Sequence, residues 1–429
     1  MDLGRYASAK RTRSVWVFSL CLVWGLGIVG ATDVARAAEE VIVDGVPHVK
    51  NGAEPEQGRV TWELEELWRA GGYDEDVFFG LITQVTNDEQ GNIYLLDTQI
   101  SEVRVFSPEG EELRTLSRQG EGPGEVNRPI DMLFMPDGTL GLAQAFPGKI
   151  VQIDLEGNPA GSFEPGSADP TQGGFFVFLD AKASASHVVI AGIRLGPTED
   201  MQGQKRTRFL ASYAPDGTED VRYLESSNEF RPPDIRIAEK DEFFVYPRRW
   251  TLDAGGRVYA ATARDEFEIT VYEPDGSVAR VIRRDFTSKK RTADETARIE
   301  AAFEAQRAQV EAQGLTMEIE IEDYEPVISQ IRLHNDQLWV YHNGSYRDVP
   351  EGVMGIWDVF SKDGRYLQEV SIAVDADGFQ DGLFFVGDKR LLVVKGLAEA
   401  ALAMQNISVP GSDEEEPEPM EVICYRVAS

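Results

Sequence analysis

Basic and aromatic side chains are the residues of this sequence that best suit ligand binding. An Arg guanidinium offers a planar, bidentate fork to carboxylate or phosphate oxygens, and an aromatic ring offers stacking area. The residues that we expect to share one site are Arg128, Tyr246, Arg248, Arg249, Arg264, His342, Tyr346 and Arg347, with Arg231, Arg236, Pro247 and Trp250 expected at the same place. Convergence of these side chains predicts a site for a small anion. The alternative is that these Arg residues form salt bridges with the abundant Asp and Glu.

Acidic residues dominate the composition. The chain has 429 residues, with 42 Lys and Arg against 74 Asp and Glu, so its formal net charge is -32. A surface this negative repels a polyanion, which argues against nucleic acid as a partner. The content of 42% hydrophobic and 10% aromatic residues excludes disorder, and two Cys residues exclude a disulfide scaffold.

The spacing patterns of common catalytic and metal sites are missing from the sequence. The four His residues, at positions 48, 187, 334 and 342, do not have the spacing of metal ligands. No G-x-S-x-G elbow, P-loop or Rossmann fingerprint occurs in a suitable context. Residues 375–382 gather three carboxylates, which makes calcium possible, but their spacing departs from the EF-hand loop. We therefore expect an ordinary loop there and no cofactor.

Residues 1–37 have the pattern of a signal peptide. Lys10, Arg11 and Arg13 precede an uncharged, apolar run over residues 15–31, and a small-x-small cleavage site ends at Ala37. An uncleaved anchor helix is the alternative, because the apolar run reaches only the short limit for a membrane span. Cleavage predicts an exported protein, periplasmic or extracellular, that does not span the membrane. We also expect the protein to be a monomer. The cysteine that it keeps, Cys424, lies in a strand-like run and is expected to be buried.

The rest of the chain repeats one unit of short β-rich segments joined by tight turns. Turns of the type Pro-Asp-Gly or Pro-Glu-Gly occur at residues 108–110, 136–138, 215–217 and 274–276, and six copies of the unit can be aligned. The first two copies are 47 residues apart, from Gly110 to Gly157, which is enough for four short strands. The prediction is an all-β fold, a six-bladed β-propeller over residues 58–429.

Two segments depart from the repeat. Residues 59–68 alternate like a strand and precede the first copy, so we expect this N-terminal strand to close the ring beside the C-terminal strands. Residues 38–57 before it are expected to be a flexible lead-in. Thr292 and Glu295 form a capping-box pattern, which predicts a helical insertion near 293–313, followed by a one-sided strand over residues 317–321. The helix packs on the ring or covers the channel mouth.

A resemblance to a known family becomes specific between the first two copies. Residues 120–129 read GEGPGEVNRP, which resembles the G-x-G-P-G-x-F-x-x-P blade linker of bacterial exported six-bladed propellers of the NHL-repeat and TolB-like groups. Val126 stands where an aromatic residue is usual and is expected to fill the same core position. The resemblance implies the fold and an extracytoplasmic location. It does not imply one activity, because such propellers include binding proteins, lyases and lactonases.

The function that we expect is an exported, non-catalytic propeller that binds a small anionic ligand or a protein partner at the channel mouth. The alternative is a propeller hydrolase or lyase that uses a divalent metal held by carboxylates. A third possibility is a structural partner in an envelope complex. An enzyme predicts converging carboxylates near the axis, whereas a binding protein predicts a mouth lined by Arg and aromatic side chains.

Overall fold

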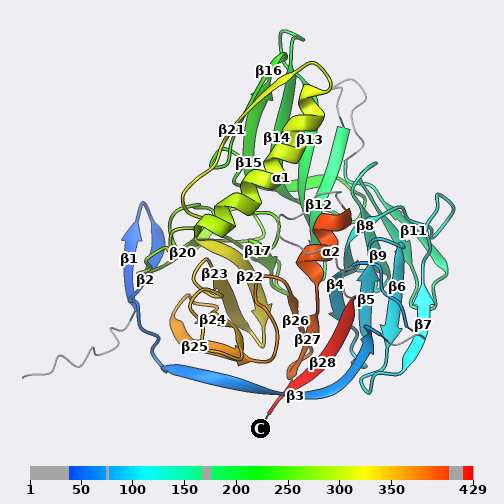
Figure 1. Ribbon diagram of the computed structural model, residues 1–429, viewed down its shortest axis with the longest axis vertical. Coiled ribbons are helices and arrows are strands. Elements are labelled where there is room, and N and C mark those ends of the chain that lie inside the picture. Colours follow the sequence, from blue (N-terminus) through cyan, green and yellow to red (C-terminus); the bar gives the residue numbers. More distant parts are fainter. Residues whose placement is uncertain (1–37, 74–76, 167–174, 405–418, 429) are drawn as a thin grey trace, which may run out of the picture. The chain divides into compact units, whose positions relative to one another are not determined.

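The computed structural model describes residues 38–73, 77–166, 175–404 and 419–428, and these are mainly β-strands (Figure 1). The predicted all-β class is therefore confirmed. The predicted signal peptide, residues 1–37, lies outside the described residues. In the described part, no helix combines the length and the apolar character that a membrane crossing needs.

The first three sheets each contain four antiparallel strands that follow one another in the chain. The first sheet contains β4 (Ile82–Asn87), β5 (Ile93–Asp97), β6 (Glu102–Phe106) and β7 (Glu112–Leu116). The second contains β8 (Pro129–Phe134), β9 (Leu140–Gln144), β10 (Lys149–Ile153) and β11 (Pro159–Phe163). The third contains β12 (Phe175–Ala183), β13 (Val188–Pro197), β14 (Gln204–Tyr213) and β15 (Glu219–Phe230).

Three further groups of strands follow the same order. The fourth contains β17 (Trp250–Leu252), β18 (Val258–Ala260), β19 (Glu268–Tyr272) and β20 (Val278–Arg284). The fifth contains β22 (Ile328–His334), β23 (Gln337–His342), β24 (Val353–Ser361) and β25 (Tyr366–Ala373). The sixth contains β26 (Gly382–Val386), β27 (Arg390–Val394) and β28 (Glu421–Val427), completed by β3 (Arg59–Gly71).

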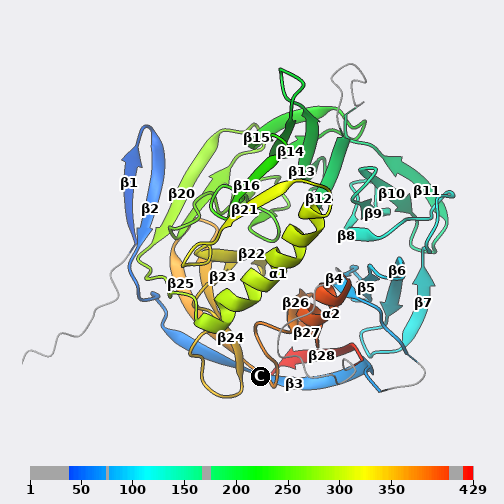
Figure 2. The same cartoon turned by 45° about the horizontal axis from the view of Figure 1, so that its top comes forward.

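β3 joins the beginning of the described chain to its end. Its second half pairs antiparallel with β28, from Leu64 opposite Val427 to Gly71 opposite Glu421. Its first half pairs parallel with β25, so the fifth and sixth groups form one continuous sheet (Figures 1 and 2). The expected ring closure depends on the first of these pairings.

Among the described residues, six apolar clusters lie between the sheets, and each joins one sheet to the next. Tyr94 and Leu140, for example, belong to the cluster between the first and second sheets. Phe384 and Leu95 belong to the cluster between the sixth and the first. Val126, from the Gly-rich linker, is fully buried in the cluster between the first and second sheets, so it fills the core position expected of it. Cys424 is buried in the cluster between the sixth and first sheets, as predicted.

The turns between strands have the geometry that the Pro-Asp-Gly pattern predicts. In the turn at 273–277, Gly276 has φ of 85°, a conformation that costs glycine little. The Asp275 carboxylate accepts a hydrogen bond from the Ser277 amide at 2.9 Å. These local interactions explain why the repeat is visible in the sequence.

Helix α1 (Ala293–Glu311) confirms the predicted insertion. Thr292 is its N-cap, and the capping box with Glu295 is complete. α1 lies beside β21 (Thr316–Glu320), the expected one-sided strand, which pairs parallel with β16 (Asp234–Ala238) (Figure 2). A second helix, α2 (Leu397–Met404), was not anticipated, and it packs on the core of the sixth sheet.

Residues 38–57 differ from the flexible lead-in that we expected. They contain β1 (Glu39–Val43) and β2 (Val46–Asn51), a hairpin whose second strand pairs parallel with β20. Asn51 is buried, and its carboxamide donates to the carbonyls of Arg283 and Gly364 at 2.9 Å each and accepts from the Tyr366 amide at 2.8 Å. These residues form strands because β2 pairs with a strand far away in the chain, which local composition does not reveal.

This anchoring role of Asn51 can be tested by substitution. Asn51→Ala leaves two carbonyls and one amide of neighbouring strands without their partner, so it should lower the free energy of unfolding by roughly 2–4 kcal/mol. Chemical denaturation measures the change, with the exposed Gln57→Ala as the control. Equal stability of the two variants would show that β2 is not anchored in this way.

Candidate functional site

The eight predicted site residues do not converge on one site. Arg128 lies immediately before β8, is exposed, and donates its backbone amide to the Ser101 hydroxyl at 3.0 Å. Tyr246 packs against Phe244, with ring centroids 6.2 Å apart. Arg249 donates to the backbone carbonyls of Ile328, Phe244 and Tyr246, so its guanidinium braces the chain before β17. These three residues therefore act locally rather than in a shared site.

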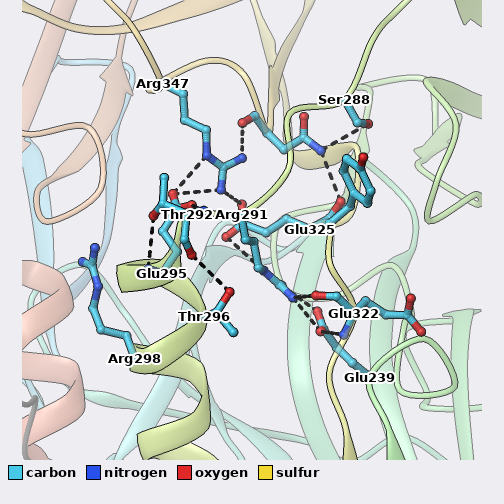
Figure 3. A network of polar contacts seen from close by, with 12 residues as sticks. Glu239, Ser288, Arg291, Thr292, Glu295, Thr296, Arg298, Glu322, Glu325 and Arg347 are labelled. Carbon is cyan, nitrogen blue, oxygen red and sulfur yellow. Dashed lines mark hydrogen bonds and ion pairs between the residues drawn. The ribbon is translucent and has the colours of Figure 1, made fainter.

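Arg264 and Arg347 belong to a largely buried network of ion pairs at the base of α1. Figure 3 shows the part of this network around Glu239, Arg291 and Arg347. Arg264 contacts Glu239 at 3.1 Å, and Arg291 binds the same carboxylate at 2.7 Å. Arg347 contacts Glu295 at 2.9 Å and Glu325 at 3.1 Å. Since Glu295 is also the capping-box residue, the network ties the first turn of α1 to the fifth sheet.

The salt-bridge alternative is therefore the correct interpretation of several Arg residues. Arg231 and Arg236 likewise pair with Asp200 and Glu320 on the exposed surface. His342 is buried and lies 3.4 Å from Asp358, with its Nδ1 accepting a hydrogen bond from the Gly344 amide at 3.1 Å. It is thus part of a core interaction.

The ion pairs shift the pKa values of the residues in this network. Burial opposes ionisation of Glu239, but hydrogen bonds from Arg291 and from the Glu322 amide outweigh it and lower its pKa. The pKa of Arg291 is raised, because contacts with Glu239 outweigh the effect of burial. Each charge in this network is compensated by another charge of the protein.

Arg248 differs from these paired residues. It precedes β17 with φ of 64°, in the left-handed region that non-glycine residues seldom adopt. Its guanidinium lies 5.9 Å from the centre of the Phe384 ring, and among the described residues no carboxylate lies within 4 Å of it. Burial lowers its pKa, which is the sign of a positive charge without enough compensation.

Arg332, on β22, also lies close to the Phe384 ring. Its guanidinium lies 5.2 Å from the centre of that ring, and its polar neighbour is the neutral Gln330 carboxamide at 2.7 Å. Burial and then the charge of Arg248 lower its pKa to about 9. Within the described ranges it also lacks a carboxylate within 4 Å.

Two buried carboxyl groups complete this inner-strand cluster, which we define as Asp131, Asp180, Lys182, Arg248 and Arg332. Lys182 Nζ lies 2.8 Å from Asp180. The Asp131 carboxyl accepts the Ala181 amide at 2.9 Å. Burial and then the charge of Asp180 raise the pKa of Asp131 to about 8, so Asp131 is mostly neutral at pH 7. Three cations then face the single carboxylate of Asp180, so the cluster has an excess of positive charge.

A pocket of about 460 Å³ opens beside Arg248. Tyr346 also lines it, so two of the predicted site residues, Arg248 and Tyr346, share this pocket. The Tyr346 hydroxyl donates to Glu325 at 2.7 Å. α1 reaches the pocket through Arg298, whose guanidinium lies 4.8 Å from the centre of the Phe379 ring. The helix therefore packs along β21 and also contacts the pocket rim.

Four residues of the inner-strand cluster lie on the first strands of their sheets and were not predicted from the sequence: Asp131, Asp180, Lys182 and Arg332. The signal was present, since Asp131 stands between Ile130 and Met132 and Arg332 stands between Ile331 and Leu333. A charged residue inside an apolar strand is seldom buried without a reason. Most of the predicted site residues come from turns and loops, whereas these charged residues lie on the inner strands, so the pattern of the turns does not reveal them.

The loop at residues 375–382 uses its carboxylates internally. The Asp377 carboxylate accepts the amides of Phe379 and Gln380, and Asp381 pairs with Lys395 at 2.9 Å. Across the described ranges, no three His, Cys, Asp or Glu side chains are grouped so that they could hold a metal ion.

No family model and no curated protein matches the sequence. Solved structures with similarity include a member of the DUF4221 family from Bacteroides vulgatus, with 12% identity over 86% of this chain and 98% of that chain and a TM-score of 0.46. Virginiamycin B lyase from Staphylococcus aureus has 9% identity over 85% and 100%, with a TM-score of 0.40. The calcium-binding protein regucalcin from Agrobacterium tumefaciens has 10% identity over 87% and 97%, with a TM-score of 0.41. Likeness of this degree says nothing about activity.

The raised pKa of Asp131 predicts that the stability of the protein depends on pH. Because this pKa is raised, the folded protein keeps a proton on Asp131 that the unfolded chain releases. The stabilisation that comes from this proton is present at low pH and is lost as the pH rises through about 8. Asp131→Asn cannot ionise, so the stability of the variant relative to wild type should increase between about pH 5 and pH 9, by on the order of 2 kcal/mol or more. Denaturant titrations across this range measure it.

Asp216→Asn is the matched control, because hydrogen bonds from Thr218 lower the pKa of Asp216 below this range. Its stability relative to wild type should stay constant from pH 5 to pH 9. Parallel behaviour of the two variants would contradict the assignment of the proton to Asp131.

The ion-pair network predicts a contrast between buried and exposed Arg residues. Arg291→Gln leaves buried Glu239 undercompensated and should lower the free energy of unfolding by about 3 kcal/mol. Arg236→Gln removes an exposed pair and should change it by less than about 1 kcal/mol. Similar losses in thermal or chemical unfolding would show that the network is not a buried structural element.

Proposed function

We propose that this protein is an exported six-bladed β-propeller that binds a small organic anion and does not catalyse a reaction. Its propeller, over residues 58–429, would be closed by β3 and related to the NHL-repeat and TolB-like groups. Four-stranded sheets in chain order, with an apolar cluster between each sheet and the next, support this architecture. The signal-peptide pattern of residues 1–37 supports export to the periplasm or the extracellular space, as a monomer.

The observation that carries the binding function is the uncompensated charge of Arg248 and Arg332. The chain has 74 acidic residues, yet neither guanidinium has a carboxylate within 4 Å in the described part of the protein. Holding two guanidinium groups near each other without a carboxylate paired to either one costs free energy, and an anion bound at Arg248 would relieve that cost. Functional sites often carry such a local cost to stability.

The enzyme alternative, a hydrolase or lyase with a carboxylate-held divalent metal, has less support from the geometry. Asp131 and Asp180 are the only two carboxylates of the inner-strand cluster, and Lys182 already contacts Asp180. A metal would have to displace this ammonium group and would meet two nearby guanidinium groups. A partner protein or an envelope scaffold would not need the uncompensated charge.

Substitution of the two Arg residues tests the proposal. Arg248→Met and Arg332→Met should each weaken binding of benzoate or acetate by at least about tenfold, measured by calorimetry. Without an anion, each variant should be as stable as wild type or more stable by about 1 kcal/mol, because an uncompensated charge is removed.

Arg128→Met is the matched control, since Arg128 also precedes an inner strand with positive φ but lies outside the pocket. It should leave anion binding unchanged. Retained binding in Arg248→Met and Arg332→Met would contradict the proposal. A rise in the unfolding temperature on adding calcium or magnesium, but not on adding anions, would favour the metal enzyme.

A further inference from the structure

The walls of the pocket suggest what kind of anion it takes. A row of aromatic rings runs along it, from Trp357 through Tyr341 and Tyr346 to Phe379. Successive ring centroids in this row are 4.8, 6.3 and 5.9 Å apart. Trp357 is buried at one end and Phe379 is 43% exposed at the other, so the row leads from the interior to the surface. Such a surface favours a flat or apolar molecule.

The pocket offers a bound molecule a single unpaired charge. Glu325 is neutralised by Arg347 at 3.1 Å, and Asp381 by Lys395 at 2.9 Å. Arg248 is the remaining charged residue among the described ones that line the pocket. Arg332, which contacts the same Phe384 ring, strengthens the positive potential without itself lining the pocket. A pocket with one accessible cation suits a monoanion, and the planar guanidinium of Arg248 suits a carboxylate.

The Tyr341 hydroxyl is a second polar group that is open to a ligand. Among the described residues it has no hydrogen-bond partner, although Tyr341 lines the pocket. Two glycines make room for it: a Cβ at Gly355 would lie 2.6 Å from the hydroxyl oxygen, and one at Gly378 would lie 2.9 Å from it. The absence of side chains at both positions keeps this donor inside the pocket.

Aliphatic side chains from neighbouring elements also line the pocket. Leu397 and Ala401 belong to α2, Leu383 to β26 and Met354 to β24. A volume of about 460 Å³ lies within the range of small-molecule sites. It can therefore enclose a body considerably larger than acetate or phosphate.

We propose that the ligand is an amphipathic monocarboxylate with an aromatic or similarly apolar body. Its carboxylate would bind Arg248, and its body would lie along Tyr341, Tyr346 and Phe379 with the Tyr341 hydroxyl as an additional donor. This inference rests on the proposed function, because it assumes that the pocket binds anions, and it adds the class of ligand.

Calorimetry with a graded set of probes tests the class of ligand. 3-Phenylpropionate should bind at least about 30-fold more tightly than acetate, since burial of the phenylethyl group adds a hydrophobic contribution. Phosphate should bind no more tightly than acetate. 3-Phenylpropanol and phenethylamine, which keep the ring but lose the carboxylate, should bind at least about 30-fold more weakly than 3-phenylpropionate.

Variants of the aromatic row separate this inference from binding of anions in general. Phe379→Ala should weaken 3-phenylpropionate by about fivefold or more while leaving acetate unchanged, because only the larger probe reaches that ring. Phe175→Ala, an exposed Phe outside the pocket, is the matched control and should change neither. Tyr341→Phe should weaken binding of both carboxylates by about fivefold without a loss of stability, because the hydroxyl has no hydrogen-bond partner among the described residues.

The outcomes distinguish the two proposals. If acetate and phosphate bind through Arg248 but 3-phenylpropionate binds no better, the class of ligand is wrong and the anion-binding function stands. If no anion binds, both are wrong. If 3-phenylpropanol binds as tightly as 3-phenylpropionate, the carboxylate is not recognised and the proposed class is also wrong.

Discussion

Two guanidinium groups that share one aromatic ring impose the main physical constraint on this structure. The guanidinium groups of Arg248 and Arg332 lie 5.9 and 5.2 Å from the centre of the Phe384 ring, and the two positive charges repel each other. The ring faces attract both cations, but less strongly than a carboxylate would. The surrounding sheets must therefore hold these charges in place by packing, at a cost in stability.

The rest of the fold provides that rigidity. Each inner-strand charge comes from, or lies next to, the first strand of its sheet, and each sheet packs on its neighbours through a buried apolar cluster. Arg249, next to Arg248, donates to three backbone carbonyls and so fixes the local backbone. The ion-pair network around Glu239 and Glu325 places α1 and Tyr346 at the pocket. Arg249 is thus held by backbone carbonyls and the Arg residues of the network by carboxylates, whereas Arg248 and Arg332 have no carboxylate within 4 Å among the described residues.

Local interactions explain what could be predicted from the sequence. The strand-turn repeat, the capping box at Thr292 and the alternation in residues 59–68 depend on residues close together in the chain, and all three are found as expected. Contacts between distant residues explain what could not. Glu239 and Arg291 are 52 residues apart, and Asn51 and Tyr366 are 315 apart, so neither pairing leaves a local pattern. For the same reason, the sequence could not show which Arg residues lack a carboxylate.

The most direct test of the uncompensated charge is a crystal structure of the protein with 4-bromobenzoate bound, with data collected at the bromine absorption edge. The account predicts one anomalous peak among Tyr341, Tyr346 and Leu397, with the carboxylate oxygens within hydrogen-bond distance of the Arg248 guanidinium. A structure in which Arg248 instead forms an ion pair with Asp131 or Asp180, and the pocket contains no bromine, would contradict it.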